Sequence, residues 1–238
     1  MKKSMLLFIS GALLADALQA VAYFADLRLD GLGWVSIGVK TLLILACLLV
    51  LRRMGTGAGF PAPHPRRRWG LILCCVLAVQ FAAQVRPLNA RPAPLVLAAA
   101  LLGVLTTALW EELYFRAVAV RLFRGELNRR TVGGMCLIFA LSHMVNAITG
   151  NWVDTGLTVF FAFGMGMLLL GLYAASGRLV LPMLAHFCVN GISVFFNCFS
   201  SLSPAIGGFS LILYPLFSVL CALFGYALLF PRGKPQRG

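Results

Sequence analysis

The sequence predicts an all-α fold, a polytopic membrane bundle of about eight transmembrane helices. Three observations predict it. Hydrophobic residues make up 61% of the 238 residues and charged residues only 11%, whereas an average soluble domain has about 25% charged residues. The apolar residues fall in runs close to the roughly 20 residues that cross a bilayer. The basic residues separate these runs, so the net charge of +13 indicates topology and contacts with membrane lipids rather than nucleic-acid binding.

Each predicted helix is an apolar run bounded by turn or basic residues. The first run continues past Asp16 to about Phe24, which is too long for a cleaved secretory signal and long enough to span. Glycine and proline separate most of the later runs. The predicted spans are about residues 5–24, 34–51, 69–86, 95–123, 131–149, 155–175, 179–199 and 208–230. We expect a single integral-membrane domain over residues 1–238, with the chemistry in a core at about 95–200.

The basic residues predict the orientation of the bundle. Only Arg28, Arg86 and Arg91 fall on one side of an eight-span arrangement. Those on the other side are Lys2, Lys3, Arg52, Arg53, Arg66, Arg67, Arg68, Arg121, Arg124, Arg129, Arg130, Arg178, Arg232, Lys234 and Arg237. By the positive-inside rule, we expect both termini to be cytoplasmic, in a bacterial inner membrane. The seven cysteines lie in apolar runs without CxxC spacing, which indicates small buried hydrophobes rather than disulfides or a thiolate metal site.

Three charged residues interrupt the fourth run. Glu111, Glu112 and Arg116 lie within a predicted membrane helix, where each charge costs at least about 2.5–3.5 kcal/mol on insertion scales and therefore indicates a functional site. Glu112 and Arg116 are four residues apart with the glutamate first, the favourable order for an ion pair on one helix face. Glu111 points about 100° further round. We expect a structural glutamate held by the arginine and a reactive glutamate left free.

Polar side chains in two other runs reach a similar depth. His143 lies in the fifth run, while His186 and Asn190 share one face of the seventh at a spacing of four residues. At about 1.5 Å per residue, Glu111 and His143 lie roughly 18 Å from the basic ends of their helices, and His186 roughly 10–12 Å. The three helices can therefore bring a carboxylate, two imidazoles and a carboxamide together.

These groups suit hydrolysis by activated water. A carboxylate can take a proton from water, an imidazole can hold or pass on that proton, and an asparagine amide can donate to a developing oxyanion. The parts fit a peptidase. Two other classes stay open, namely a transporter or proton-coupled carrier that uses the cluster as a relay, and a catalytically silent membrane scaffold. The absence of repeats with matching broken helices weakens the transporter reading.

The three segments together resemble a known family, the CPBP intramembrane proteases, which include type II CAAX prenyl proteases, bacteriocin-processing enzymes and Abi-like proteins. Its pattern is EExxxR, FxxxH and HxxxN on separate membrane helices. Here the pattern reads Glu111-Glu112 to Arg116, Phe139 to His143, and His186 to Asn190, in the same order. The resemblance covers roughly residues 95–200, and the first three runs and the last carry no recognised motif.

The resemblance implies a role for each motif residue. Glu111 would activate water, His143 and His186 would be catalytic-site histidines, and Asn190 would stabilise the oxyanion. Structural support is implied for Glu112, Arg116 and Phe139. The implied activity is an endopeptidase acting on a membrane-associated protein or peptide.

We expect no cofactor and no metal, because every group then has one task. The alternative is a zinc ion held by His143 and His186 with Glu111, a set that would supply three ligands and an open position. No short HExxH-like spacing supports that alternative, and a metal would take Glu111 away from acting as the base.

Other intramembrane polar residues match no motif. Asp16 and Lys40 are candidates for a buried interhelical pair. Gly164, Gly166 and Gly171 in the sixth run indicate close helix packing rather than chemistry.

Overall fold

The structure, a computed structural model, describes residues 2–29, 31–55, 69–85, 87–148, 152–201 and 208–230. Within these ranges it contains helices and no strands, which confirms the predicted all-α bundle. The elements are α1 (Lys2–Leu29), α2 (Trp34–Met54), α3 (Trp69–Gln84), α4 (Pro94–Glu112), η1 (Leu113–Val118), α5 (Ala119–Leu122), α6 (Arg129–Ser142), η2 (His143–Ile148), α7 (Trp152–Ser176), α8 (Val180–Phe199) and α9 (Gly208–Leu229). Because α4, η1 and α5 form one rod and α6 and η2 another, each predicted span coincides with one helical rod.

Several rods have the length and apolar composition of membrane spans. Among the described residues, five satisfy both conditions, namely α1, α2, the rod Pro94–Leu122, α7 and α8. Helices α3 and α9 contain the shorter apolar stretches Ile72–Ala82 and Tyr214–Leu229. Large apolar side chains on the outside of the bundle, such as Leu13, Leu42 and Leu223, are mostly exposed. In a membrane these side chains would face lipid, so the chain is an integral membrane protein.

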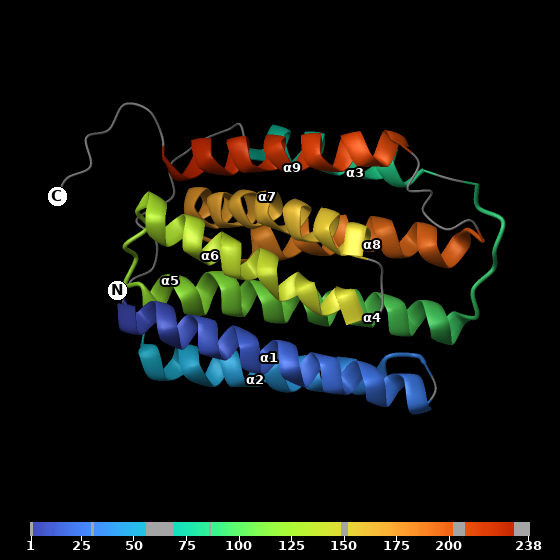
Figure 1. Cartoon of the computed structure of the whole chain (residues 1–238), viewed down its shortest axis with the longest axis horizontal. Coiled ribbons are helices and arrows are strands. Elements are labelled where there is room, and N and C mark those ends of the chain that lie inside the picture. Colours follow the sequence, from blue (N-terminus) through green and yellow to red (C-terminus); the bar gives the residue numbers. More distant parts are fainter. Residues whose placement is uncertain are drawn as a thin grey trace.

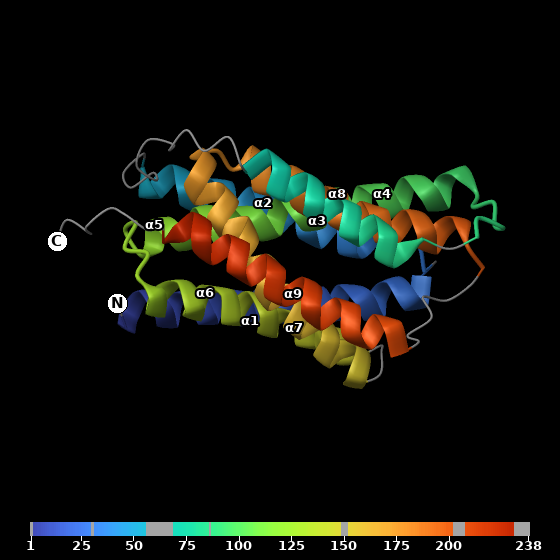
Figure 2. The ribbon, with the colours of Figure 1, turned by 90° about the horizontal axis from the view of Figure 1, so that it is seen from above.

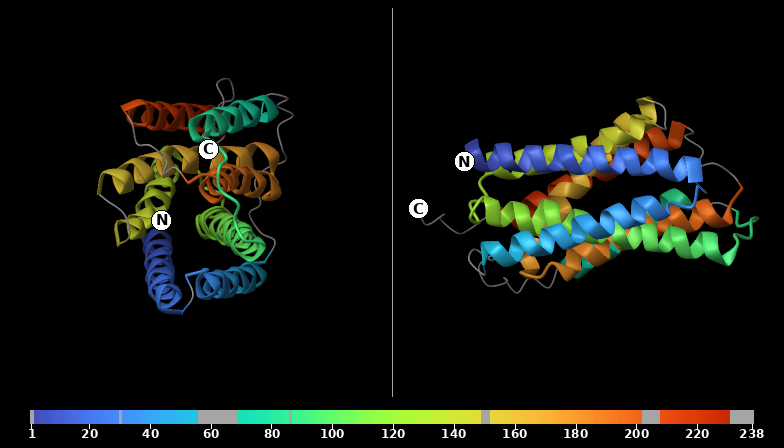
Figure 3. Two further views of the ribbon diagram at one scale, coloured as in Figure 1. Left: turned by 90° about the vertical axis from the view of Figure 1, so that its right-hand side faces the viewer. Right: turned by 90° about the horizontal axis from the view of Figure 1, so that it is seen from below.

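The rods stack as two columns of four (Figures 1 and 3). One column is α1, α6, α7 and α9, and the other is α2, α4, α8 and α3, with each helix packed on the next in its column. Cross-contacts join α1 to α2, α7 to α8 and α3 to α9. Figure 2 shows α9 crossing over α7, to which it is closely packed. The facing helices α4 and α6 are joined mainly by side chains of η1 that reach Phe139.

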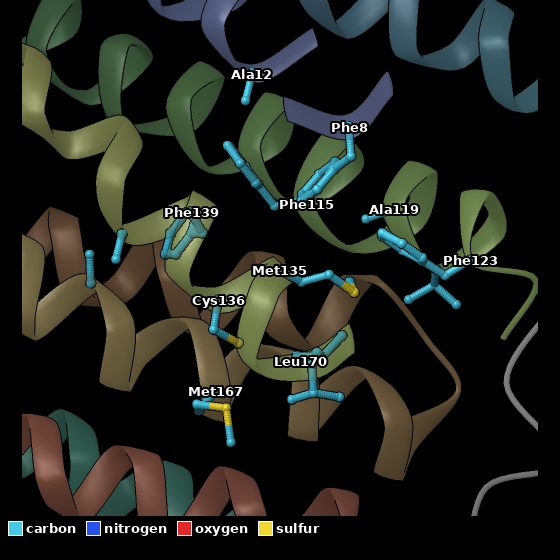
Figure 4. Packing of buried hydrophobic residues seen from close by; sticks show 14 of the residues in the cluster. Phe8, Ala12, Phe115, Ala119, Phe123, Met135, Cys136, Phe139, Met167 and Leu170 are labelled. Carbon is cyan, nitrogen blue, oxygen red and sulfur yellow. The ribbon is translucent and has the colours of Figure 1, made fainter. Parts of the chain in front are cut away.

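Glycines allow the closest approaches between helices. A Cβ at Gly171 would lie 2.9 Å from the backbone oxygen of Gly225, so α7 and α9 touch through their backbones. A Cβ at Gly166 would lie 3.0 Å from Cδ1 of Phe139, so this glycine makes room for the aromatic ring of α6. Both contacts are van der Waals packing, the expected use of small residues between membrane helices. Figure 4 shows the apolar cluster formed here by α1, η1, α5, α6 and α7.

Most basic residues of the described ranges lie at one end of the bundle; the exceptions are Arg28, Lys40, Arg91 and Arg116. The start of α1 and the end of α9 lie at this end (Figure 1). Arg121 of α5 donates to the carbonyl of Leu51 at the end of α2, and the Arg129 guanidinium lies 5.7 Å from the centre of the Tyr226 ring. We call this end the basic end. Arg66, Arg67, Arg68, Arg86, Arg232, Lys234 and Arg237 lie outside the described residues.

Polar side chains fix two helices whose sequences carry no motif. At the end of the bundle away from the basic end, Asp26 of α1 accepts from the backbone N–H groups of Val35 and Ser36, at 2.7 and 2.9 Å, and so caps the start of α2. On α3, Gln80 donates to Ser193 Oγ at 2.9 Å and Gln84 to the Tyr214 hydroxyl at 2.7 Å. These bonds hold α3 against α8 and α9.

Candidate active site

The rod formed by α4, η1 and α5 carries Glu111, Glu112 and Arg116, and we call it the motif rod. Its backbone changes directly after Glu112. Helix α4 ends there and continues as the π-helix η1, in which the N–H of Ala119 donates to the carbonyl of Tyr114, five residues earlier. A π-turn inside an α-helix is rare and frequently lies at a functional site. Glu112 and Arg116 are almost completely buried, with 0% and 1% of their surface exposed. The buried glutamates at the end of α4 and the buried Arg116 of η1 thus meet where the helix type changes.

Arg116 and Glu112 form the ion pair that their spacing predicts. The Arg116 Nη1 and Glu112 Oε1 atoms are 3.0 Å apart. The guanidinium carbon also lies 4.2 Å from the centre of the Phe139 ring, a cation–π contact between the motif rod and α6. Breaking a buried pair by removing one partner typically costs about 3–5 kcal/mol, because a charge is then left without compensation. Removing Arg116 is therefore expected to destabilise the fold.

Glu112 has a second partner that its sequence position does not reveal. Nδ1 of His186, on α8, lies 2.8 Å from Glu112 Oε1 and forms a hydrogen bond with it. Because the carboxylate can only accept, Nδ1 carries the hydrogen. A neutral His186 then presents an unprotonated Nε2 on its other side, and that atom lies 3.7 Å from Glu111 Oε2. Glu112 thereby fixes both the position and the tautomer of the imidazole that faces Glu111.

The distance between Glu111 and His186 suits a shared water. At 3.7 Å the two atoms are too far apart for a good direct hydrogen bond, and Glu111 Oε2 has no hydrogen-bond partner among the described residues. A water at about 2.8 Å from both atoms would donate one hydrogen bond to each. The pair can therefore hold a water between a carboxylate and an imidazole nitrogen.

His143 stands at a second break in helix type. Helix α6 ends at Ser142, and His143 begins the tighter 3₁₀ turn η2. Its Nδ1 lies 2.9 Å from the carbonyl oxygen of Phe139, so Nδ1 donates and Nε2 is left as the outward nitrogen. The Phe139 ring is 5.0 Å from the His143 ring and 6.2 Å from the His186 ring, centre to centre. The Phe139 ring thus lies against both histidine rings. No ion pair or hydrogen bond within the described ranges joins His143 to Glu111.

Asn190 lies one turn beyond His186 on the same face of α8 and is partly buried. Helices α4 and α8 run in opposite directions (Figure 1), so Asn190 is about level with Ala108, deeper in the bundle than Glu111 as measured from the basic end. Among the described residues Asn190 has no hydrogen-bond partner. Its amide is therefore available to a substrate oxygen.

The same stretch of chain matches a known family. Residues 93–192 match the family described as type II CAAX prenyl endopeptidase, Rce1-like. This region is a CPBP-family intramembrane protease domain. The match extends from the start of α4 into α8 and includes all seven motif residues. Members of the family are proteases, which supports a proteolytic activity here. No curated protein and no solved structure matches the chain.

Helix α1 lies outside the matched CPBP region but packs on the motif rod within that region. The Tyr114 hydroxyl donates to the carbonyl of Phe8 at 2.6 Å, and the Phe8 ring meets the Phe115 ring edge-on. Gly11 leaves room for Tyr114, since a Cβ there would lie 3.1 Å from Cζ of that ring. No motif in the sequence predicted a role for α1. The structure shows that it supports η1 from the side opposite to α8.

The suggested pair between Asp16 and Lys40 is absent. Lys40 Nζ donates instead to Thr107 Oγ1 on α4, at 2.8 Å, and no ion pair among the described residues includes either Asp16 or Lys40. Glu111 nevertheless lies close enough for its charge to act on both residues. The reason lies in the helix register, because Lys40 faces α4 rather than α1.

The described residues offer no preformed metal site. No group of three or more His, Cys, Asp or Glu side chains in these ranges has an arrangement that could hold a metal ion. In the CPBP domain, His186 already donates from Nδ1 to Glu112 and would have Nε2 left for a metal. Independence from metal stays a prediction to be tested by experiment.

Proposed function

We propose that this chain is an intramembrane endopeptidase in which Glu111 activates water to hydrolyse a peptide bond of a membrane-associated protein or peptide. The observation that carries this proposal is the placement of Glu111 beside Nε2 of His186. Glu112, which is paired with Arg116, binds Nδ1 on the other side of the same ring. The arrangement supports a general base next to a positioned proton acceptor. It also gives each of the two adjacent glutamates its own task.

The chemistry needs one water and no bound group. Glu111 takes a proton from the water as the water oxygen attacks the carbonyl carbon of the substrate. The carbonyl oxygen becomes an oxyanion, to which the Asn190 amide can donate. When the intermediate collapses, the proton passes from Glu111, directly or through His186 Nε2, to the amide nitrogen. The C–N bond breaks, leaving one new carboxyl group and one new amine.

The cellular setting is proposed on the charge distribution. We infer that the basic end faces the cytoplasm of a bacterial cell, with both termini on that side of the inner membrane. The substrate would then be a membrane-anchored protein or peptide that reaches Glu111 from within or beside the bilayer. The family description, a CAAX prenyl endopeptidase, makes a lipidated protein tail one candidate.

The decisive experiment compares cleavage by matched glutamine variants. Glu111→Gln is expected to lower cleavage about 10²- to 10⁴-fold, the range for losing a general base, while the protein still inserts and accumulates. His186→Ala should do the same, and Asn190→Ala should cost about 10²- to 10³-fold. Glu126→Gln is the control, because Glu126 is an exposed glutamate beyond the end of the same rod. Truncated proteins in the membrane proteome provide the readout.

An unchanged set of truncated proteins on replacing Glu111 would overturn the proposal. Solute uptake by the reconstituted protein, without any peptide cleavage, would instead indicate a carrier that uses the same Glu–His cluster.

Metal removal tests the water-activation step separately. Purified active protein is expected to contain no stoichiometric zinc and to keep its activity after extended chelation, because Glu111 alone supplies the base. The measurement is elemental analysis together with the cleavage rate before and after chelation. Stoichiometric zinc, with activity lost on chelation and restored by zinc, would make His143 and His186 metal ligands.

A further inference from the structure

Lys40 lies inside the bundle close to Glu111, and the proposed mechanism gives it no task. It belongs to α2, outside the region that matches the protease family. Its ammonium Nζ lies 2.8 Å from Thr107 Oγ1 on α4. Thr107 precedes Glu111 by four residues, so the two side chains share one helix face and are one turn apart. The ammonium is therefore held next to the reactive carboxylate, slightly further from the basic end.

No carboxylate of the described residues forms an ion pair with this ammonium. Asp26 acts on Lys40 only from a distance, because its two oxygens are bonded to the start of α2. Thr107 contributes a neutral oxygen, and its own hydroxyl hydrogen is used on the carbonyl of Gly103 at 2.8 Å. An ammonium has three N–H donors, so two are left over. A charged side chain in a membrane helix that has no counter-ion in direct contact indicates a function.

The left-over donors suit a small anion at the end of a peptide. An ammonium is a compact point charge, which suits a single carboxylate. The Glu111 carboxylate repels an anion brought to this region, so the anion needs a direct contact with the Lys40 ammonium. We propose that Lys40 binds the C-terminal carboxylate of the substrate and thereby sets how far from the chain end Glu111 cuts. This inference rests on the proposed protease function.

The spacing predicts the length of the released fragment. One helical turn is about 5.4 Å along the axis, and an extended peptide advances about 3.3–3.6 Å per residue. With the reach of the lysine side chain added, about two to three residues separate a carboxylate on Lys40 from a carbonyl beside Glu111. The substrate chain would enter past Glu111 and end at Lys40.

A simpler role for Lys40 predicts a different result. If Lys40 only offsets the negative charge of Glu111, its loss changes cleavage of every substrate alike. If it binds the terminal carboxylate, its loss affects only substrates that have one. The two roles are separated by changing the substrate rather than the protein.

The test measures peptide binding to the Glu111→Gln protein, full length and in lipid nanodiscs, so that no cleavage occurs. The probe is a peptide with a farnesylated cysteine followed by three apolar residues, made with a free C-terminal carboxylate or a carboxamide. The free acid is expected to bind at least about tenfold more tightly, because a charge-assisted hydrogen bond is lost in the amide. A third peptide, with a carboxamide end and an aspartate as last residue, shows whether a side-chain carboxylate can substitute.

Variants then assign the preference to Lys40. In Glu111→Gln/Lys40→Met, the free acid should bind as weakly as the amide. Lys40→Arg should keep part of the preference, and Thr107→Val, which retains the charge but removes its anchor, should reduce it less than Lys40→Met. Arg178→Ala is the control, because Arg178 is exposed at the basic end. Equal binding of acid and amide, binding of neither, or an acid preference that survives Lys40→Met would each overturn the inference.

The inference and the proposed function fail in different ways. Because the acid–amide comparison requires no change at Lys40, it holds even if Lys40→Met does not fold. Should wild-type protein bind the free acid through Lys40 but not cleave it, the protease proposal fails and the carboxylate site stands. Should it cleave acid and amide peptides at equal rates, with equal binding, the protease proposal stands and the role of Lys40 is wrong.

Discussion

Glu112 illustrates how one buried carboxylate can serve two partners. Its Oε1 atom lies 3.0 Å from the Arg116 guanidinium and 2.8 Å from His186 Nδ1. The arginine compensates the charge, and the histidine uses the same oxygen for orientation. We therefore expect a substitution here to affect stability and activity through separate contacts.

Replacing the arginine tests the stability contact. Arg116→Ala is expected to lower the yield of folded protein and its melting temperature, because Glu112 is left as an unpaired buried charge, a loss of about 3–5 kcal/mol. Size-exclusion yield and thermal unfolding in detergent provide the measurement. Arg178→Ala, at an exposed arginine, should change neither. Normal yield and melting of Arg116→Ala would show that Glu112 is not held by this pair.

Replacing the glutamate tests the orientation contact. In Glu112→Gln the amide oxygen can still accept from His186 Nδ1, whereas Arg116 loses its counter-ion. We expect less folded protein, with part of the cleavage rate kept per folded molecule, and a much lower rate for Glu112→Ala. Full yield together with full activity in Glu112→Gln would refute the division of tasks between the two glutamates.

At the scale of elements, both motif rods change helix type at the site. The rod that begins as α4 turns into the π-helix η1 after Glu112, and α6 tightens into η2 at His143. Between them lies the Phe139 ring, seated against Gly166 of α7. Because this ring lies against both histidine rings, we expect the packing of α7 on Phe139 to affect the site.

A valine at Gly166 should disturb the site through Phe139. The added Cβ would lie 3.0 Å from that ring, and such overpacking typically costs about 1–3 kcal/mol. We expect a lower melting temperature and slower cleavage in Gly166→Val. Gly156→Val on the same helix is the matched control, since a Cβ there meets nothing within 4 Å. Equal effects of the two valines would point to helix propensity rather than to the ring.

The sequence predicted the helical rods well and the contacts between them only in part. Apolar runs and their breakers determine the rods, and helical spacing determines the Glu112–Arg116 pair, because both depend on neighbours along the chain. The bond from Glu112 to His186 depends on how α4 packs on α8, and the bond from Lys40 to Thr107 depends on the register of α2. Neither leaves a local signal. The changes of helix type are likewise set by packing.

At the scale of the whole molecule, the site lies between two columns of helices, and the two outer helices at each end of the pair of columns come from outside the matched region. The matched protease region supplies α4, α6, α7 and most of α8, while α1 and α2 close one side and α3 and α9 the other. Helices without a motif thus contribute walls and, in Lys40, a charge. The basic end predicts the direction of the whole bundle in the membrane.

Reporter fusions test that direction. Fusions after residues 59 and 238 are expected to report the cytoplasm, because arginines and lysines are retained on the cytoplasmic side. A reporter fused to the chain cut after Gly31 is expected to report the opposite side. Residues 59 and 238 lie outside the described residues, so these two fusions rest on the charge pattern alone. Opposite signals from the fusions after residues 59 and 238 would contradict an even number of spans.

The π-helix η1 has a consequence for changes in chain length. A π-turn closes its hydrogen bonds over one residue more than an α-turn, so the motif rod carries one residue that a regular helix would not need. Deleting Leu113 should let the rod close as an ordinary α-helix, with Glu112 and Arg116 still neighbours at a spacing of three. Because the wide turn absorbs the deleted residue, Glu111 would keep its orientation relative to α5. A one-residue deletion in η1 is thus expected to leave an inserted, accumulating protein, whereas a similar deletion within the regular helix α7 would rotate its two parts by about 100° relative to each other and should break its packing on α9.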